Sequence, residues 1–141
     1  MKEIYIDATD MIVGRFASKV AKSAMLGNTV KVFNCEKALI SGRKHLIIDD
    51  WMNRRKRGTY AKGPFFSRMP DRFVRRIIRG MLSHRKPRGR EAYERIKCYI
   101  GVPDEFKDKK LASFKDASIS KLPTLKYIYV GELCKLLGAK L

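Results

Sequence analysis

Residues 4–33 of this 141-residue chain have the sequence IYIDATDMIVGRFASKVAKSAMLGNTVKVF. Ile4–Ile6 is a short run of high β propensity, and Val30–Phe33 is a second one. Between them, residues 12–26 carry apolar side chains at helical spacing, and Gly27 ends that pattern. A strand, a helix and a strand joined by short links predict a βαβ unit with parallel strands and a right-handed crossover. We therefore expect an α/β fold.

A helix and a loop are expected next along the chain. The helix would cover residues 43–57, where Asp50 lies one turn before Arg54. Its buried side would consist of four apolar residues, Ile47, Ile48, Trp51 and Met52. The loop at residues 58–66 (GTYAKGPFF) contains two glycines, a proline and three aromatic residues. Two interpretations remain open for Phe65 and Phe66: they stack on nucleobases, or they anchor the loop to the core.

Residues 70–82 (PDRFVRRIIRGML) are predicted to form an arginine-rich helix. Asp71 is expected to cap its N-terminus, and Gly80 is expected to end it in the left-handed conformation. On a helical wheel, four arginines fall within about 100° of arc, opposite the apolar side chains: Arg72, Arg75, Arg76 and Arg79. Close like charges repel one another, so we expect these arginines to bind a polyanion rather than to stabilise the domain. The alternative is an ordinary solvated face.

The segment after this helix, residues 83–90 (SHRKPRGR), combines a proline and a glycine with four Lys or Arg residues and a histidine. This composition predicts an extended or turning segment that presents positive charge to a polyanion. A short helix at residues 91–96 and a strand at residues 97–100 should follow, and the strand should end at Gly101.

The remainder of the chain has a different character. Acidic and basic residues alternate over residues 104–120, which predicts a weakly structured and nearly neutral connection. An extended packing segment at residues 122–130 and a closing helix at 131–137 are expected after it. We interpret residues 1–141 as a single domain, with a core at about residues 1–103 and a C-terminal extension at about 104–141.

The charge of the chain is large and unevenly distributed. Lys and Arg number 32 and Asp and Glu number 14, which gives a net charge of +18. The segment from Arg54 to Arg90 alone holds 14 basic residues and one acidic residue, Asp71. Such asymmetry predicts a nucleic-acid interface, and a membrane surface is the weaker alternative. Without a run of 18 apolar residues or a signal-peptide core, we expect a soluble, cytoplasmic protein.

No arrangement of residues predicts catalysis. No catalytic constellation can be assembled around His45 or His84, and Gly14-Arg15 lies outside any glycine-rich phosphate motif. The three cysteines lack the spacing of a zinc site and are expected to be reduced core thiols: Cys35, Cys98 and Cys134. We therefore expect no enzyme, cofactor or metal. Two rival functions stay open, namely an RNA- or nucleotide-processing enzyme and a general nucleic-acid coating protein.

Several short motifs occur in the same order as in a known family. They are Asp7-Ala8, Gly14-Arg15-x-Ala17-Ser18, Asn34 with Glu36, Ser41-Gly42, Lys62-Gly63-Pro64, Arg79-Gly80-Met81-Leu82, Gly89, and Tyr99-x-Gly101-x-Pro103. With them the chain resembles the L-thirteen family of large-subunit ribosomal proteins over residues 3–103. Ser83 stands where proline is usual, and Cys35 where alanine is usual. The segment after Pro103 matches the general pattern of the family poorly and looks closer to archaeal members.

This resemblance implies a three-layer α/β/α fold with a small, mostly parallel, four-stranded sheet. It also implies binding to large-subunit (23S-type) rRNA early in assembly, beside neighbouring large-subunit ribosomal proteins and without a small-molecule substrate. Together with the charge pattern, it predicts a structural protein that clamps rRNA helices through the arginine-rich helix and its flanking basic loops. The expected RNA-binding residues are Arg15, Arg54, Arg55, Lys56, Arg57, Lys62, Arg68, Arg72, Arg75, Arg76, Arg79, His84, Arg85, Lys86, Arg88 and Arg90.

Overall fold

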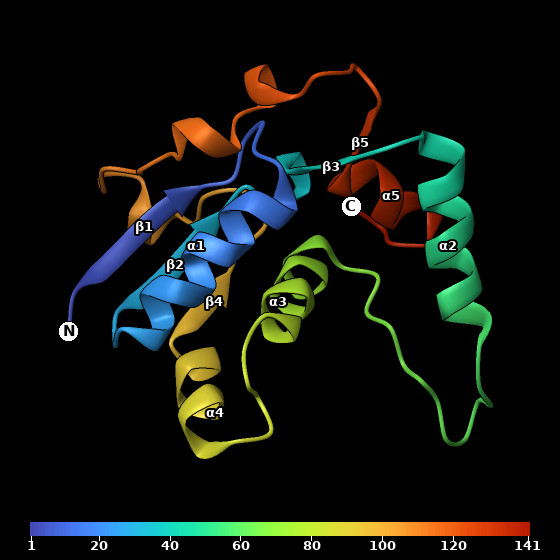
Figure 1. Cartoon of the computed structure of the whole chain (residues 1–141), viewed down its shortest axis with the longest axis horizontal. Helices are drawn as coiled ribbons and strands as arrows, with labels where there is room; N and C mark the ends of the chain where they lie inside the picture. The colour runs from blue at the N-terminus through green and yellow to red at the C-terminus, as the bar shows by residue number, and fades with distance from the viewer.

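The computed structural model describes residues 1–141 and contains the expected βαβ unit. Strand β1 (Glu3–Asp7), helix α1 (Val13–Met25) and strand β2 (Thr29–Phe33) follow one another, each within one residue of its predicted limits. The two strands pair in parallel over their full lengths (Figure 1). Gly27 ends the turn after α1 with a φ of +94°, a conformation that glycine adopts without steric cost.

The chain forms two small sheets in place of one four-stranded sheet. Strand β4 (Ile96–Cys98) pairs in parallel with β2, so that the parallel sheet has the order β1-β2-β4. Strands β3 (Leu39–Ser41) and β5 (Tyr127–Tyr129) form a separate antiparallel pair. The prediction of four strands in the main sheet is therefore wrong. Asn34, with a φ of +55°, turns the chain away after β2, which directs β3 out of the parallel sheet.

Helices cover one face of the parallel sheet. Side chains from α1, α3 (Pro70–Gly80) and α4 (Pro87–Glu94) share one core with the apolar residues of the strands, including Ile6, Val30, Val32 and Ile96. The opposite face carries an aromatic cluster in which ring centroids lie 5.3–6.3 Å apart. It consists of Tyr5, Phe33, Tyr99 and Phe106, the last from a 3-10 turn (Asp104–Phe106). Because successive side chains of a strand point to opposite faces, the aliphatic residues and the aromatic residues lie on opposite sides of the sheet. The aromatic rings therefore cover the face on which a second layer of helices was expected.

Helices α2 (Lys44–Lys56) and α5 (Val130–Leu136) lie side by side, away from the parallel sheet (Figure 1). Both were predicted, and the expected ion pair between Asp50 and Arg54 forms at 2.9 Å. The apolar side of α2 is only partly buried, although Ile47, Ile48, Trp51 and Met52 all pack against the core. Helix α2 is therefore attached less tightly than α1 or α3.

The segment after Pro103 is bound to the rest of the chain. It contains no long helix before α5, as expected, but only 3-10 turns at Lys115–Ala117 and Ile119–Lys121 in addition to the first. However, the N–H of Ala112 donates to the carbonyl of Tyr5 (2.8 Å), and the N–H of Ile12 donates to the carbonyl of Ala117 (2.7 Å). Of the extended segment predicted at 122–130, only β5 is a strand. None of the helices is both long and apolar enough to span a membrane.

Candidate nucleic-acid interface

The arginine-rich helix α3 begins and ends differently from its prediction. Pro70 occupies its first position, so that Met69 is the N-cap residue and Asp71 lies inside the first turn without capping it. Proline suits this position because the first N–H groups of a helix have no intrahelical partner. One carboxylate oxygen of Asp71 is buried without a hydrogen-bond partner. Gly80 is the last helical residue and is not left-handed, because the chain continues into a turn at Met81.

The four arginines of α3 have two different roles. Arg75 donates from Nε to the carbonyl of Ile96 (3.0 Å), and its guanidinium lies 4.4 Å from the ring centroid of Tyr93. Arg76 donates to the carbonyl of Phe65 (2.9 Å) and lies 4.0 Å from the ring centroid of Phe66. The expectation that these arginines do not stabilise the domain is therefore wrong for two of them. The remaining pair, Arg72 and Arg79, makes no hydrogen bond or ion pair through its side chains.

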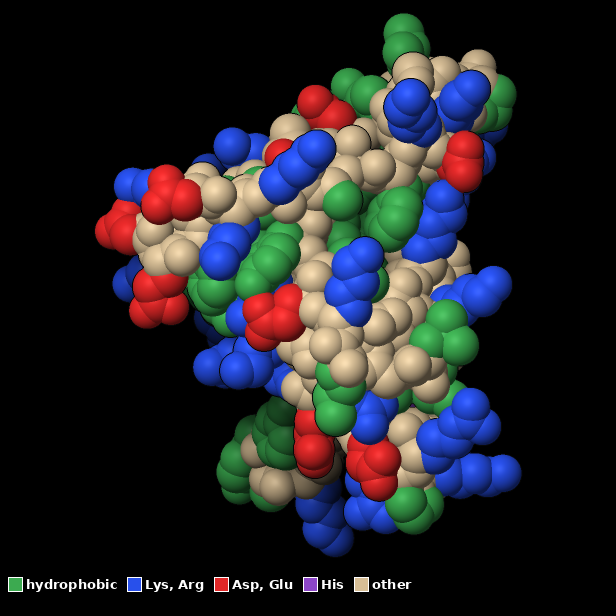
Figure 2. Space-filling view, turned by 90° about the vertical axis from the view of Figure 1, so that its left-hand side faces the viewer, with side chains coloured by type: hydrophobic (Ala, Val, Ile, Leu, Met, Phe, Trp, Pro, Cys, Tyr) green, Lys and Arg blue, Asp and Glu red, His purple; other side chains and the backbone are tan.

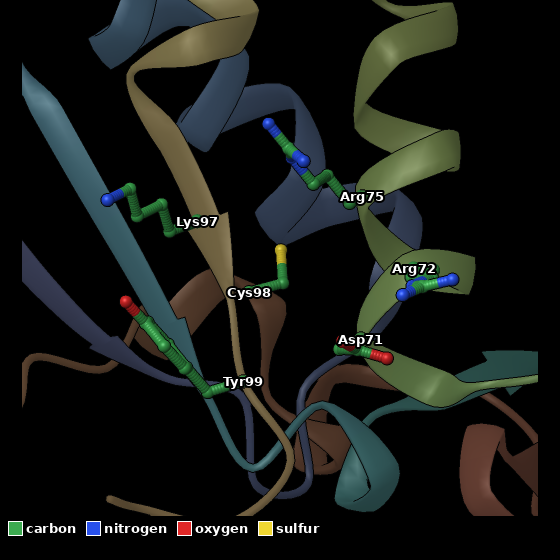
Figure 3. Close-up of a pocket in the computed structure, with 6 residues that line it drawn as sticks. All are labelled: Asp71, Arg72, Arg75, Lys97, Cys98 and Tyr99. Atoms are coloured by element: carbon green, nitrogen blue, oxygen red, sulfur yellow. The ribbon is translucent and has the colours of Figure 1, made fainter.

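A pocket of about 290 Å³ lies between α3 and β4. In Figure 3 Arg72 and Asp71 extend from α3, whereas Cys98 points from β4 into the space toward Arg75. Lys97 lines the same pocket, although its side chain points to the other face of β4, as does that of Tyr99. Sequence reasoning missed Lys97 because it considered basic residues only as far as Arg90.

The loop before α3 is closed on itself. The N–H of Gly63 donates to the carbonyl of Thr59 (2.9 Å), and Gly58 lies so close that a Cβ there would be 1.9 Å from the Gly63 oxygen. Its aromatic side chains differ in exposure. Phe66 is partly buried and meets Trp51 edge-on, with centroids 6.2 Å apart, so it anchors the loop. Phe65 and Tyr60 remain 69% and 98% exposed.

The segment after α3 is more structured than its composition predicted. The chain turns over residues 81–86, and α4 begins at Pro87, so residues 87–90 are helical rather than extended. Gly89 permits this packing, because a Cβ there would lie 2.1 Å from the carbonyl oxygen of Ser83. The basic side chains of this segment are all exposed, namely Arg85, Lys86, Arg88 and Arg90. His84 is half-buried, with Nδ1 3.4 Å from the carbonyl oxygen of Leu82.

The end of α2 is joined to the C-terminal helix. Arg55 donates to the carbonyl of Leu137, at the negative end of the α5 dipole. The side chains of Arg55 and Arg68 both approach Gly138. A Cβ placed on Gly138 would lie 3.6 Å from Nη1 of Arg55 and 3.3 Å from Nη1 of Arg68. The basic residues beyond this contact are exposed and unpaired, namely Lys56, Arg57 and Lys62. Helix α5 thus brings α2 close to the segment that leads into α3.

Arg15 lies apart from this arrangement. It extends from α1 and donates to the carbonyl of Asp116 (3.2 Å), so it contacts the C-terminal segment and not the basic segment at residues 54–90. On this side of the molecule, which includes β1 and the segment after Pro103, acidic side chains lie among the basic ones (Figure 2). Lys19 pairs there with Asp116 at 2.8 Å. The unpaired positive charge is therefore concentrated on residues 54–90.

A second basic cluster was not predicted. Arg43, Lys44, His45 and Lys126 line a cavity of about 340 Å³ at the start of α2. Lys44 is paired with Glu132 at 2.8 Å. Lys126 is distant in sequence, and it reaches this cluster only because β3 and β5 pair, so no sequence pattern could have revealed it.

The cysteines are free thiols, and Cys35 and Cys134 are buried in the core as expected, whereas Cys98 is half-buried. Contact with the Cys98 thiol, together with burial, raises the pKa of Cys35 well above its ordinary value. Burial, with a further contribution from the Asp71 carboxylate, raises the pKa of Cys134 to about 12. Both groups are therefore neutral thiols at physiological pH.

Comparison with known proteins identifies the family. A family model described as "Ribosomal protein L13" matches residues 1–105. The chain is 40% identical over 135 residues to "Large ribosomal subunit protein uL13" of Methanococcoides burtonii, with 96% of this chain and 97% of that protein covered. The proteins of the same name from Methanosarcina barkeri and Methanocaldococcus jannaschii are each 42% identical, over 136 and 140 residues, with the same coverage. The resemblance seen in the motifs is confirmed, and the chain belongs to the L-thirteen family of ribosomal proteins.

Proposed function

We propose that this chain is a structural component of the large ribosomal subunit and binds the rRNA of that subunit. Its curated relatives are named as proteins of the large ribosomal subunit, and they match nearly the full length of the chain. The family is one of structural ribosomal proteins and not of enzymes, which is the class expected from the sequence. The chain would act in the cytoplasm, in contact with rRNA and neighbouring ribosomal proteins.

The unpaired cations of residues 54–90 carry this proposal. Ten basic side chains of this segment make no hydrogen bond or ion pair within the chain: Lys56, Arg57, Lys62, Arg68, Arg72, Arg79, Arg85, Lys86, Arg88 and Arg90. Like charges held this close repel one another and destabilise the isolated protein. A phosphate backbone across the segment would offset that repulsion, because guanidinium groups bind phosphate oxygens bidentately.

The arrangement supports a clamp in which rRNA helices are held by phosphate contacts. The α/β core supplies a rigid platform, and residues 54–90 extend from it as the end of α2, the loop, α3 and the start of α4. Arg75 and Arg76 hold the neighbouring segments in position, while Arg72 and Arg79 are free to bind. Phosphate contacts fix position and carry little sequence information, so the shape of the folded RNA would select the site. Binding of this kind suits an early step of assembly, before other proteins cover the RNA.

A salt-titrated competition tests the proposal against a general nucleic-acid coating protein. Labelled large-subunit rRNA is bound to the purified chain from about 50 to 500 mM salt, with tRNA and duplex DNA as competitors, because non-specific binding falls steeply over this range. We expect rRNA to be retained at high salt after both competitors are lost. Equal loss of all three nucleic acids would contradict the proposal.

Two charge variants sharpen the experiment. The first changes Arg72, Arg79, Arg85 and Arg88 to Gln, none of which has a partner in the chain. It should reduce the slope of log affinity against log salt by roughly 3, because each phosphate contact contributes about 0.7–0.9. The matched control removes the same charge from the C-terminal segment by changing Lys109, Lys110, Lys115 and Lys121 to Gln. An equal decrease of the slope in both variants would indicate generic charge instead of an interface.

A further inference from the structure

The loop at residues 57–69 carries two aromatic rings whose exposure is not explained by phosphate contacts alone. Tyr60 is 98% exposed and Phe65 is 69% exposed, whereas Phe66 of the same loop is partly buried. Exposed rings contribute nothing to the core. The loop extends beyond the C-terminal end of α2, away from the sheet and its helices (Figure 1). The rings are therefore presented to an external partner.

The loop is held in place while its two rings remain free. Thr59 closes the turn, through its carbonyl to the N–H of Gly63 (2.9 Å) and through its hydroxyl to the N–H of Lys62 (3.1 Å). Arg76 of α3 donates to the backbone of Phe65 (2.9 Å), and Phe66 packs against Trp51. A fixed loop loses little conformational entropy on binding, which favours it as a preformed site.

The surroundings of the rings select the chemistry of the partner. Arg57 and Lys62 lie close to the rings in sequence, and both are exposed and unpaired. No acidic residue occurs between Asp50 and Asp71. An apolar protein surface would not use these cations, and an acidic peptide would not use the flat rings. A nucleotide uses both, because its base has a π face and its phosphate carries a negative charge.

We propose that Tyr60 and Phe65 form a stacking site for unpaired nucleobases of RNA, with Arg57 and Lys62 on the adjoining phosphates. Bases inside a duplex are stacked on each other and cannot lie on these rings, so the ligand is a single-stranded loop, bulge or end. The inference rests on the proposed function, since it takes RNA as the partner, and it adds the kind of RNA that this loop recognises.

The test uses the full-length chain and two RNA probes with equal numbers of phosphates. One is a single-stranded oligoadenylate that carries 2-aminopurine, and the other is a fully paired duplex. The ring variant combines Tyr60→Leu with Phe65→Leu, which keeps apolar side chains and removes the π faces. It should bind the single strand about 5- to 100-fold more weakly and lose the fluorescence quenching of 2-aminopurine. Its affinity for the duplex and its salt slope should not change.

Three further variants serve as controls. Tyr60→Phe with Phe65→Tyr keeps both π faces and should bind the single strand as the wild type does. Leu125→Ala removes another exposed apolar side chain, 91% exposed, and should have no effect. Arg57→Gln with Lys62→Gln should lower the salt slope for both RNAs while quenching persists. Equal weakening of both probes by the ring variant, or no weakening of either, would overturn the stacking site.

Failure of this inference can be told apart from failure of the proposed function. In one case the ring variant binds both probes as the wild type does, while the wild-type chain still retains rRNA at high salt after tRNA and duplex DNA are lost. The stacking site is then overturned and the rRNA proposal stands. If ring-dependent quenching occurs but rRNA has no advantage over tRNA and duplex DNA, the stacking site stands and the rRNA proposal is overturned.

Discussion

Gly80 and Gly89 are both helical, but they serve different purposes. Gly80 ends α3 in ordinary helical conformation with no heavy atom within 4 Å of the position of a Cβ. Gly89 is buried in α4, where a Cβ would lie 2.1 Å from the carbonyl oxygen of Ser83. The sequence alone predicted an extended or turning segment around Gly89 and a left-handed cap at Gly80. In the folded chain the roles differ: of these two positions, only Gly89 requires a residue without a Cβ, because the backbone of Ser83 approaches it closely.

The substitution Gly89→Ala should therefore destabilise the chain. The new methyl group meets backbone atoms, which cannot move as a flexible side chain would, so we expect a loss of about 1–3 kcal/mol, typical of overpacking. Gly80→Ala is the matched control and should stabilise by about 0.5–1 kcal/mol, because alanine favours the helix. Urea unfolding followed by circular dichroism measures both values. A Gly89→Ala variant as stable as Gly80→Ala would contradict the packing.

The arginines illustrate the same limit of sequence reasoning. Arg72 and Arg75 belong to the same helical face, and nothing in their spacing distinguishes them. Arg75 has a partner only because β4 brings the carbonyl of Ile96 to 3.0 Å from its Nε. Periodicity identified the face correctly, whereas the division into structural and free arginines depends on a strand 21 residues away in sequence.

At the scale of elements, helix α3 holds the loop that precedes it. Arg76 contacts the backbone of Phe65 and the ring of Phe66, and Phe66 in turn packs on Trp51 of α2. The loop is thus joined to α2 and α3 by one arginine and one aromatic ring. This connection also explains why α2 stays in place with no fully buried side chain.

Loss of this connection should open the loop. Arg76→Gln removes a charged hydrogen bond and the contact with the Phe66 ring, so we expect cleavage after Lys62 by a lysine-specific protease to become about 2- to 10-fold faster. Arg79→Gln is the control, because it removes the same charge from the same helix and Arg79 has no partner. Cleavage rates followed by mass spectrometry give the comparison. Equal rates in the two variants would show that Arg76 does not hold the loop.

At the scale of the whole molecule, the C-terminal segment is part of the core. Its buried side chains lie in the same cluster as those of the parallel sheet, namely Ala117, Ile128, Val130, Leu133, Cys134 and Leu137. Its backbone also bonds to β1 through Ala112. We propose that residues 1–141 fold as one cooperative unit, in which residues 104–141 are needed for stability.

A chain truncated after Pro103 should therefore fail to fold cooperatively. Removal of one large buried side chain costs about 2–5 kcal/mol, and the loss of several exceeds the 5–15 kcal/mol by which a typical domain is stable. Thermal unfolding followed by circular dichroism would give one sharp transition for the full chain and a broad or absent one for residues 1–103. A sharp transition in the fragment would show that the core folds without its extension.

Local sequence patterns determined the elements of this protein, whereas contacts between distant segments decided how those elements are used. Period-2 and period-3.6 patterns placed β1, α1, β2, α2 and α5 close to their observed limits, because these elements bury one apolar side. The order of the strands, the helical start of α4 and the contacts of Arg75 and Arg76 depend on segments that are not adjacent in sequence. The positive charge of residues 54–90 needed no structure to be recognised, since charge is a property of composition. Which cations remain free to bind was decided only by tertiary structure, because a cation is free only where no carbonyl, carboxylate or ring lies within reach.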